Sequence, residues 1–349
     1  MKINVLVRVV AVISIFFSVH SIALPEISPY KGLVLAQGAN EGELREQALQ
    51  QVLIKVSGNI DVNKLDESKA LTKHISSILS QFGYQQIGNA RFYYALFDSR
   101  KINKALVDMQ QPIWGETRPK PLIWLVNEDR QITSEHMINS SQDSSISWGL
   151  TKSQLTRGIS AQFPLIDLDD SLAIRASDIS GRFYQTIANA SKRYDAEYFV
   201  LANLVKTGDG KSQLKWELVQ YNAQSKKSKV LIKQTNRGSK SYVMSIMLSD
   251  IADYYAKQFA ILENNGEKLT QELNVKNINS LKDLTGLNSL LDGLNAVDSF
   301  EIVYISEHQV KVSVTLKGGL MSLKNALNVQ THLQKDLSSG STFFYKWKP

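Results

Sequence analysis

The sequence predicts a multidomain protein of mixed α/β and α+β class, and three observations support this prediction. The chain has 349 residues, which is longer than one typical domain. Hydrophobic residues make up 43% and charged residues 21%, as in ordinary globular proteins. Strand-like segments alternate with helix-like segments along the chain. We expect a central mixed α/β sheet domain followed by a ferredoxin-like β-α-β-β-α-β domain.

The N-terminus has the pattern of a cleavable export signal. Lys2 and Arg8 precede an apolar run over residues 9–19, which ends at small residues typical of a cleavage site. We therefore predict a signal peptide over residues 1–23 and a periplasmic mature chain; retention of the signal as an anchor is the alternative. The chain contains no cysteine, which excludes disulfide frameworks and thiolate metal sites.

The next segment predicts an N-terminal α+β domain over residues 24–111. It opens with an extended segment at 31–36. Asn40 and Glu43 then have the spacing of a capping box at the start of a helix, which Gly58 ends. The remaining expected elements are a helix with Leu71, Ile75, Ile78, Leu79 and Phe82 on one side, a strand over 91–97, and a short helix through Ile102, Leu106 and Met109.

Residues 112–120 contain two prolines and predict a linker to a central α/β domain over 121–265. The apolar run at 121–126 is typical of a strand covered on both faces. The elements expected after it are a polar loop at 139–147, a helix through Leu155, Ile159 and Phe163, a strand at 164–168, a helix through Phe183, Ile187 and Tyr194, a strand at 198–205, an antiparallel pair at 211–220 and 230–235, and a helix from Val243 to Leu262. Within the pair, we expect Leu214, Trp216 and Leu218 to face inward and Lys215 and Glu217 to face outward.

The last unit, over residues 266–349, predicts the ferredoxin-like domain. Ser280 and Asp283 have the spacing of a helix cap. The expected order is a strand at 269–278, a helix with Leu284, Leu287, Leu291 and Leu294 on its buried side, strands at 300–305 and 310–316, a helix through Leu320, Leu323 and Leu327, and a strand at 343–347.

No segment carries a recognisable catalytic or cofactor motif. Residues 208–212 end like a phosphate-binding loop, but Val205 stands where that motif needs a glycine, and a hairpin turn explains the segment. The histidines lie in separate segments without metal-ligand spacing, and the G-x-S-x-G pattern of serine hydrolases is absent. We therefore predict no catalytic residue, no cofactor and no metal.

Positive charge is concentrated between residues 206 and 240, a segment that contains nine basic and two acidic residues. Because export removes nucleic acid as a partner, anionic envelope lipid or glycan, or an acidic protein, is the expected ligand. The alternative is that these lysines protect an exposed hairpin against strand-to-strand aggregation. The candidate interaction residues in this basic hairpin are Lys211, Lys215, Lys226, Lys227, Lys229 and Lys233.

Asp167, Asp169 and Asp170 form a second candidate interaction surface. Their spacing resembles a calcium loop, but Leu172 stands where that loop needs glycine. The simpler interpretation is a loop after a strand, whose acids cap the next helix. The same carboxylates would be the acid and base of a hydrolase, which would need a deep cleft and a carboxylate with a raised pKa.

Several phrases together resemble a known but uncharacterised family. They are the segment 52–58 with its Val-Ser-Gly end, the strand at 121–126, Arg157-Gly158 leading to 164–170, and the segment 190–196. This set is similar to gammaproteobacterial envelope proteins catalogued as domain of unknown function number 2066. The resemblance implies a secreted protein and brings no catalytic residues. The middle unit also looks like the small α/β domains of periplasmic assembly factors related to curli secretion and to activators anchored in the outer membrane, which act by docking.

These observations favour a non-enzymatic periplasmic binding or docking protein, an accessory factor in assembly or maintenance of the cell envelope. Its expected partner is an envelope protein or an anionic envelope lipid or glycan, with peripheral membrane contact and without nucleic acid. The alternatives are an envelope glycan or peptide hydrolase that uses the carboxylates near 167–170, and a periplasmic carrier of a small ligand held between two domains.

Overall fold

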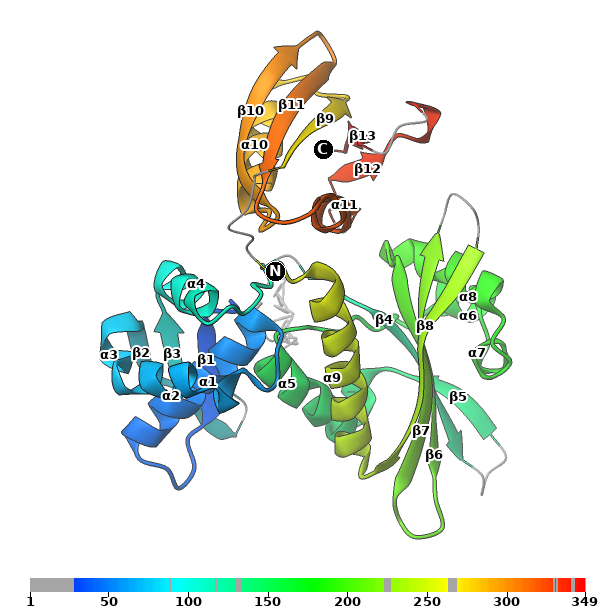
Figure 1. Cartoon of the computed structure of the whole chain (residues 1–349). Helices are drawn as coiled ribbons and strands as arrows, with labels where there is room; N and C mark the ends of the chain where they lie inside the picture. Colours follow the sequence, from blue (N-terminus) through cyan, green and yellow to red (C-terminus); the bar gives the residue numbers. More distant parts are fainter. Residues whose placement is uncertain are drawn as a thin grey trace, which may run out of the picture.

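The computed structural model describes residues 28–87, 89–116, 118–129, 134–222, 227–262, 269–328, 330, 332–339 and 343–348. The expected signal peptide lies outside these residues. The described part folds into three units, each built around its own sheet (Figure 1). Among the described helices, none combines the length and apolar character needed to cross a bilayer.

The N-terminal unit packs its helices against a small antiparallel sheet of order β1-β3-β2. Its elements are β1 (Lys31–Leu35), α1 (Glu41–Ser57), α2 (Asp66–Lys73), α3 (Ile75–Ile78), β2 (Leu79–Ile87), β3 (Ala90–Phe97) and α4 (Ser99–Asp108). The capping box at Asn40 and Glu43 is confirmed, and Gly58 ends α1 in the left-handed conformation. The helix expected to reach Phe82 is wrong, because from Leu79 onward the chain pairs with β3 as a strand.

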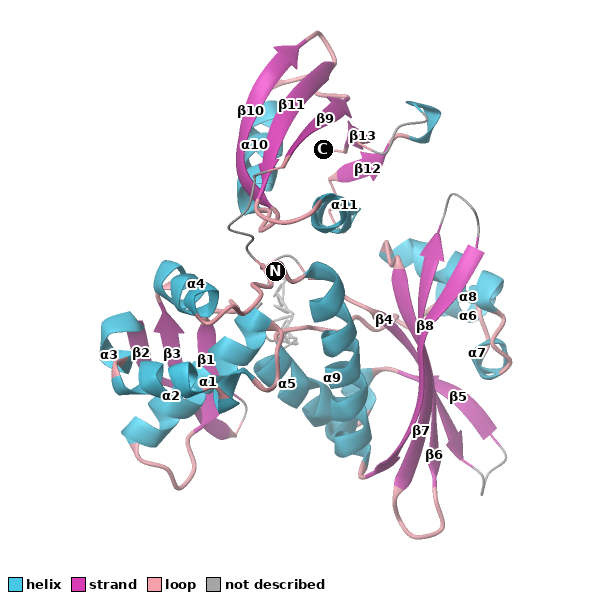
Figure 2. Cartoon of the chain, viewed as in Figure 1, coloured by secondary structure: helices cyan, strands magenta, loops and turns pink. Residues whose placement is uncertain are grey.

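The central unit holds a mixed sheet of order β5-β4-β6-β7-β8, in which β4 and β6 are parallel. Helices α5 and α9 cover one face and α6, α7 and α8 cover the other (Figure 2). The elements are β4 (Leu122–Asp129), β5 (Ser134–Ile138), α5 (Ser144–Arg157), α6 (Leu168–Ala173), α7 (Ala176–Ser180), α8 (Tyr184–Ser191), β6 (Tyr198–Lys206), β7 (Ser212–Asn222), β8 (Lys227–Gly238) and α9 (Lys240–Phe259). The predicted multidomain α/β and α+β class is confirmed.

Three expected elements of this unit differ in the structure. The strand at 164–168 does not form, because Ile166 has a positive φ of 55° and Asp167 caps α6 instead. The polar loop at 139–147 already contains the first turn of α5, which Asp143 caps. Gly158, with a φ of 69°, ends that helix before the expected apolar positions 159 and 163.

The outward orientation expected for Glu217 is also wrong. Its side chain is only 2% exposed, because the second face of the sheet is covered by α6–α8 rather than by solvent. Tyr184 donates a hydrogen bond to one carboxylate oxygen at 2.8 Å, and Lys233 forms an ion pair with the other at 3.0 Å. Leu214, Trp216 and Leu218 do face the core, on the side of α9.

The C-terminal unit has the sheet order β10-β11-β9-β13-β12. Its elements are β9 (Thr270–Lys276), α10 (Leu281–Gly293), β10 (Val297–Ile305), β11 (Gln309–Leu316), α11 (Leu320–Asn328), β12 (Leu333–Lys335) and β13 (Phe344–Trp347). The six elements of the ferredoxin-like pattern are present in the expected order. One extra strand, β12, forms a hairpin with β13 at the sheet edge, so that β13 runs parallel to β9. Short 3-10 helices cover Val62–Lys64, Ser140–Gln142, Lys192–Tyr194 and Leu337–Ser339.

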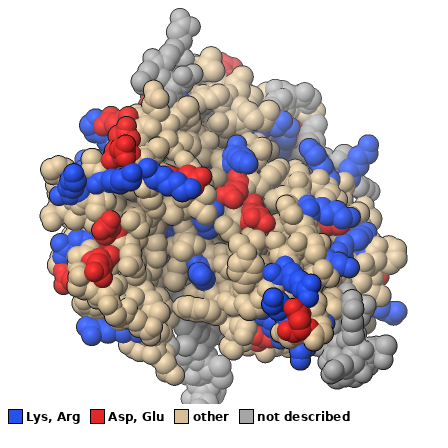
Figure 3. Space-filling model, turned by 60° about the horizontal axis from the view of Figure 1, so that its bottom comes forward, with Lys and Arg blue, Asp and Glu red and all other residues tan. Residues whose placement is uncertain are grey.

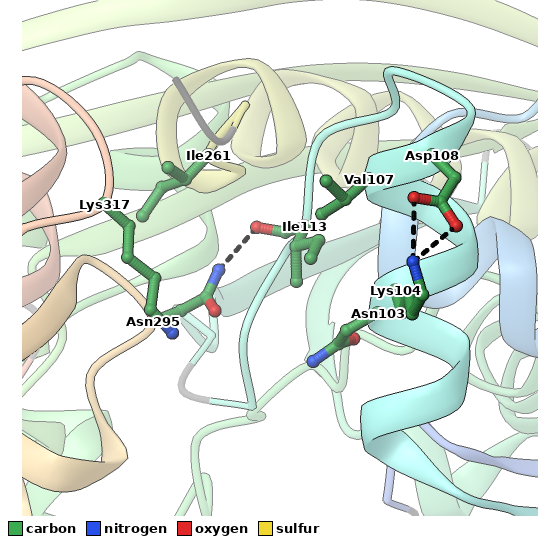
Figure 4. Close-up of a pocket in the computed structure, with 8 residues that line it drawn as sticks. All are labelled: Asn103, Lys104, Val107, Asp108, Ile113, Ile261, Asn295 and Lys317. Atoms are coloured by element: carbon green, nitrogen blue, oxygen red, sulfur yellow. Dashed lines mark hydrogen bonds and ion pairs between the residues drawn. The ribbon is translucent and has the colours of Figure 1, made fainter. Parts of the chain in front are cut away.

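The three units meet at an isolated antiparallel β-bridge between two residues. Ile113 and Ile261 pair through their backbones, and Asn295 of the C-terminal unit donates its amide to the Ile113 carbonyl oxygen at 2.7 Å. These residues line a cavity of about 260 Å³ beside α4 (Figure 4). Part of the segment expected to be a linker is thus buried at this junction, where Trp114 is 1% exposed, whereas Glu116 and Lys120 of the same segment are exposed.

Arg118 completes this junction by donating to five backbone carbonyl oxygens. It binds Trp114 and Gly115 of its own segment, Lys55 near the end of α1, and Arg157 and Gly158 at the end of α5, at distances between 2.7 and 3.2 Å. Carbonyl groups at helix C-termini carry partial negative charge. The carbonyl groups at the ends of two helices from different units thus stabilise the positive charge of one guanidinium.

Candidate docking surface

The acidic segment at the start of α6 is an internal ion-pair network. Arg193 binds Asp167 through both terminal nitrogens, each at 2.6 Å. Asp170 is only 2% exposed and accepts hydrogen bonds from the Ile166 amide at 2.8 Å and the Tyr194 hydroxyl at 2.5 Å. The structure thus uses two of the three predicted site acids to hold α6 in place, and only Asp169 projects fully into solvent.

This network does not have the electrostatics of a general acid. Hydrogen bonds from Arg193 hold the pKa of Asp167 well below its usual range. A carboxyl group that is to donate a proton near neutral pH needs a raised pKa. The described residues also contain no cluster of three or more His, Asp or Glu side chains able to hold a metal ion. The simpler interpretation, helix capping, describes Asp167 directly, since it accepts from the Asp170 amide at 3.1 Å.

The basic hairpin does not gather its charges on one surface. Glu217 pairs with Lys233 across the strands, so Lys215 and Lys233 lie on the same sheet face. Lys229 pairs with Gln220 and Lys227 pairs with Asn222, which follow Glu217 by three and five residues. Because side chains alternate between the two faces of a sheet, Lys227 and Lys229 lie on the opposite face. On the face drawn in Figure 3, lysines and arginines are dispersed among uncharged and acidic groups.

Two of the predicted basic residues already have acidic partners. Lys233 pairs with the buried Glu217, and Lys211 lies 3.8 Å from Asp209 in the turn before β7. Lys226 lies outside the described residues. Since β8 is the outermost strand of the central sheet, its exposed lysines lie along an open edge. Charged side chains at such an edge discourage pairing with a foreign strand.

The C-terminal sheet ends in a very different edge. β10 is outermost, so one side of its backbone has no strand partner among the described residues. Along nine residues it carries the exposed apolar side chains of Ile302, Val303, Tyr304 and Ile305, of which Val303 and Ile305 are each 55% exposed. Its only charged residues are Asp298 and Glu301. We call Val297–Ile305 the open edge.

The exposure of the open edge could not be predicted from the sequence. Residues 300–305 have the composition of a buried strand. Their exposure follows from the position of β10 at the end of the sheet order, which depends on contacts distant in sequence. The sequence predicts the strand at 300–305 but not its exposure, and a run of bulky apolar residues without lysine is the available signal.

Comparison with known proteins yields one family match. Residues 30–115 match the model of a domain of unknown function (DUF8605). No curated protein matches the chain. Among solved structures, the dodecamer of a PelC variant from Paraburkholderia phytofirmans has 11% sequence identity and a TM-score of 0.22, and the match covers 40% of this chain and 88% of that one. That TM-score is too low to support an argument about fold. The N-terminal unit thus coincides with an uncharacterised domain family, consistent with the expected resemblance to a domain of unknown function.

Proposed function

We propose that this protein is a non-enzymatic docking factor of the bacterial envelope, which binds an extended segment of a partner protein along the open edge. The observation that carries the proposal is the exposed apolar run of β10 at the end of its sheet. Unpaired backbone groups of an edge strand can hydrogen-bond to an added strand, while alternate side chains select its sequence. The two edges differ: β8 carries lysines, whereas β10 carries none.

The composition of the open edge defines the partner. Glu301 is an exposed acidic residue next to the apolar run 302–305, so a mainly apolar segment with a basic residue opposite Glu301 would complement it. A periplasmic partner protein agrees with the export signal that we predict over residues 1–23, and with the proposed resemblance to gammaproteobacterial family number 2066. Anionic lipid or glycan at the basic hairpin is the competing ligand.

Photocrosslinking in intact cells tests the proposal. A photoreactive amino acid at position 303 should capture a discrete partner, whereas one at Leu281 should not. Leu281 is the matched control because it lies in the same unit and is 78% exposed. Equal capture at both positions would show nonspecific contact and would reject the proposal.

A binding titration then tests the mode of docking. A synthetic peptide that covers the crosslinked segment should bind the wild type. The double variant Val303→Lys, Ile305→Lys gives β10 the charge pattern of β8 and should weaken binding at least about tenfold. The variant Leu281→Lys should bind like the wild type. Retention of anionic vesicles that disappears in high salt, without any peptide binding, would instead favour the basic hairpin.

A further inference from the structure

A large cavity opens where the three units meet. It has a volume of about 890 Å³, and its lining includes Ser28 of the N-terminal unit, Gln162 of the central unit and Gln334 on β12. A volume of this size suits a ligand of several rings. Most of the residues that line it have polar side chains, and the rings of Tyr194 and Tyr198 add apolar surface beside them. Sites for purely apolar ligands are lined mostly by hydrophobic groups, whereas a sugar offers both hydroxyl groups and apolar C–H faces. We propose that this cavity binds a neutral oligosaccharide.

The side-chain amides of the cavity carry the proposal. Gln154 and Gln162 line it from the central unit, and Asn328 and Gln334 line it from the C-terminal unit. Each amide offers both a donor and an acceptor, as does each hydroxyl of a sugar. Within the part of the chain that the structure describes, the side chains of Gln154 and Gln162 have no hydrogen-bond partner although both are half-buried. They are therefore available to a ligand.

The start of β6 supplies further acceptors. Glu197 and Tyr198 both line the cavity, and the Gln220 amide donates to Glu197 at 2.7 Å and to the Tyr198 hydroxyl at 3.3 Å. Only one oxygen of Glu197 is engaged in this contact. The second carboxylate oxygen can accept a ligand hydroxyl, and a hydrogen bond to a carboxylate is stronger than one to a neutral group.

The charge of the cavity favours a neutral ligand. Lys120 and Lys348 line it together with Glu116, Asp195 and Glu197, so neither sign dominates. Arg118, which also lines it, directs its guanidinium to the five carbonyl groups of the junction. The negative charge of a phosphorylated or strongly acidic ligand would be repelled by the three carboxylates. Arg118 is already engaged by carbonyl groups and would not form the bidentate contact that arginine makes with such anions.

Titration of the full mature chain with defined sugars tests the inference. Chitotetraose, cellotetraose and maltotetraose serve as probes at millimolar concentration, and tetra-alanine serves as the peptide comparator. At least one sugar should bind by calorimetry and raise the melting temperature, since a ligand that binds only the folded state stabilises it. No binding of any of the three sugars, or preferential binding of tetra-alanine, would overturn the inference.

Matched variants locate the binding. Gln162→Leu and Gln334→Leu should each weaken sugar binding about tenfold, the usual effect of one lost hydrogen bond. Gln334 is exposed, so its replacement leaves the fold intact. The exposed Gln234 on β8 lies outside the cavity lining, and Gln234→Leu should bind like the wild type. Sugar binding that survives in both cavity variants would contradict the assignment. The open-edge variant should bind sugar normally, which separates this inference from the docking proposal.

Discussion

Lys55 is a buried cation, and its charge should lower the free energy of unfolding by a measurable amount. It is 1% exposed, and its ammonium donates to the Lys31 carbonyl oxygen. Burial, followed by the charges of Arg118 and Lys31, lowers its pKa from 10.5 to about 7. Lys55→Met should therefore stabilise the protein at pH 7 by several kcal/mol, since one pKa unit corresponds to about 1.4 kcal/mol. Denaturant unfolding measures the change.

The lowered pKa of Lys55 also predicts how the stability of the protein changes with pH. Between pH 7 and 10.5 the unfolded chain holds the Lys55 proton more tightly than the folded chain does, so this residue makes wild-type stability rise with pH across that window. The advantage of Lys55→Met should shrink accordingly and vanish near pH 10.5. The exposed Lys73 is the control, and Lys73→Met should change stability little at any pH. A stabilisation independent of pH would mean that packing, and not charge, is the cause.

The α6 segment depends on one buried carboxylate. Asp170 holds Ile166, a β-branched residue with positive φ, and also binds Tyr194 and Arg193. Asp170→Ala should lower the free energy of unfolding by about 3 kcal/mol, because it leaves buried donors unpaired. Its neighbour Asp169 is 78% exposed, and Asp169→Ala should stay within about 0.5 kcal/mol of the wild type. Equal effects of the two replacements in denaturant unfolding would refute the assigned role.

The β8 edge tests the protective interpretation of the basic hairpin. Lys227→Val combined with Lys229→Val removes two exposed charges from the outermost strand. The variant should self-associate with rising concentration, because an apolar edge recruits other strands. Light scattering measures this, with Lys73→Val and Lys152→Val as the exposed control pair on helices. A double β8 variant that remains as monodisperse as the control would remove edge protection as the reason for these lysines.

Long elements with a strong local pattern could be predicted from the sequence. α1 has a capping box and a terminal glycine, and β4 and β6 each contain a run of five consecutive apolar residues. The short helix α6 could be predicted only in part: Asp167 has the pattern of a helix cap, but the position of the helix also depends on Arg193 and Tyr194, which follow Asp170 by 23 and 24 residues. The three-residue β12 has too few residues for a periodic signal. The cavity and the open edge could not be predicted for a related reason. Both depend on which elements lie next to one another in the folded chain, and these elements are distant in sequence.

At the scale of the whole molecule, the junction around Arg118 couples the first two units. The N-terminal sheet and the central sheet have separate main cores. Their mutual placement depends on the contacts of α1 and the N-terminal sheet with α5, and on the segment that joins the units. Arg118 contributes three of these contacts from one planar group, to the carbonyl oxygens of Lys55, Arg157 and Gly158. A lysine has three donors on a single nitrogen and cannot reach carbonyl groups spread over two helix ends.

Arg118→Lys should therefore lower stability by at least about 3 kcal/mol, because hydrogen bonds from a charged donor contribute roughly 1.5–3 kcal/mol each. Calorimetry should also resolve separate melting of the N-terminal unit, since the replacement frees the carbonyl groups of Lys55 and Arg157 that now share one partner. Arg91→Lys is the matched control, because the guanidinium of Arg91 stacks over the Tyr84 ring on an exposed surface. One cooperative transition at the wild-type temperature in Arg118→Lys would show that the two units stay together without this residue. The hydrogen bond from Arg157 to the Gly58 carbonyl oxygen and the packing of Leu155 against Leu33 and Phe92 would then be sufficient to fix their placement.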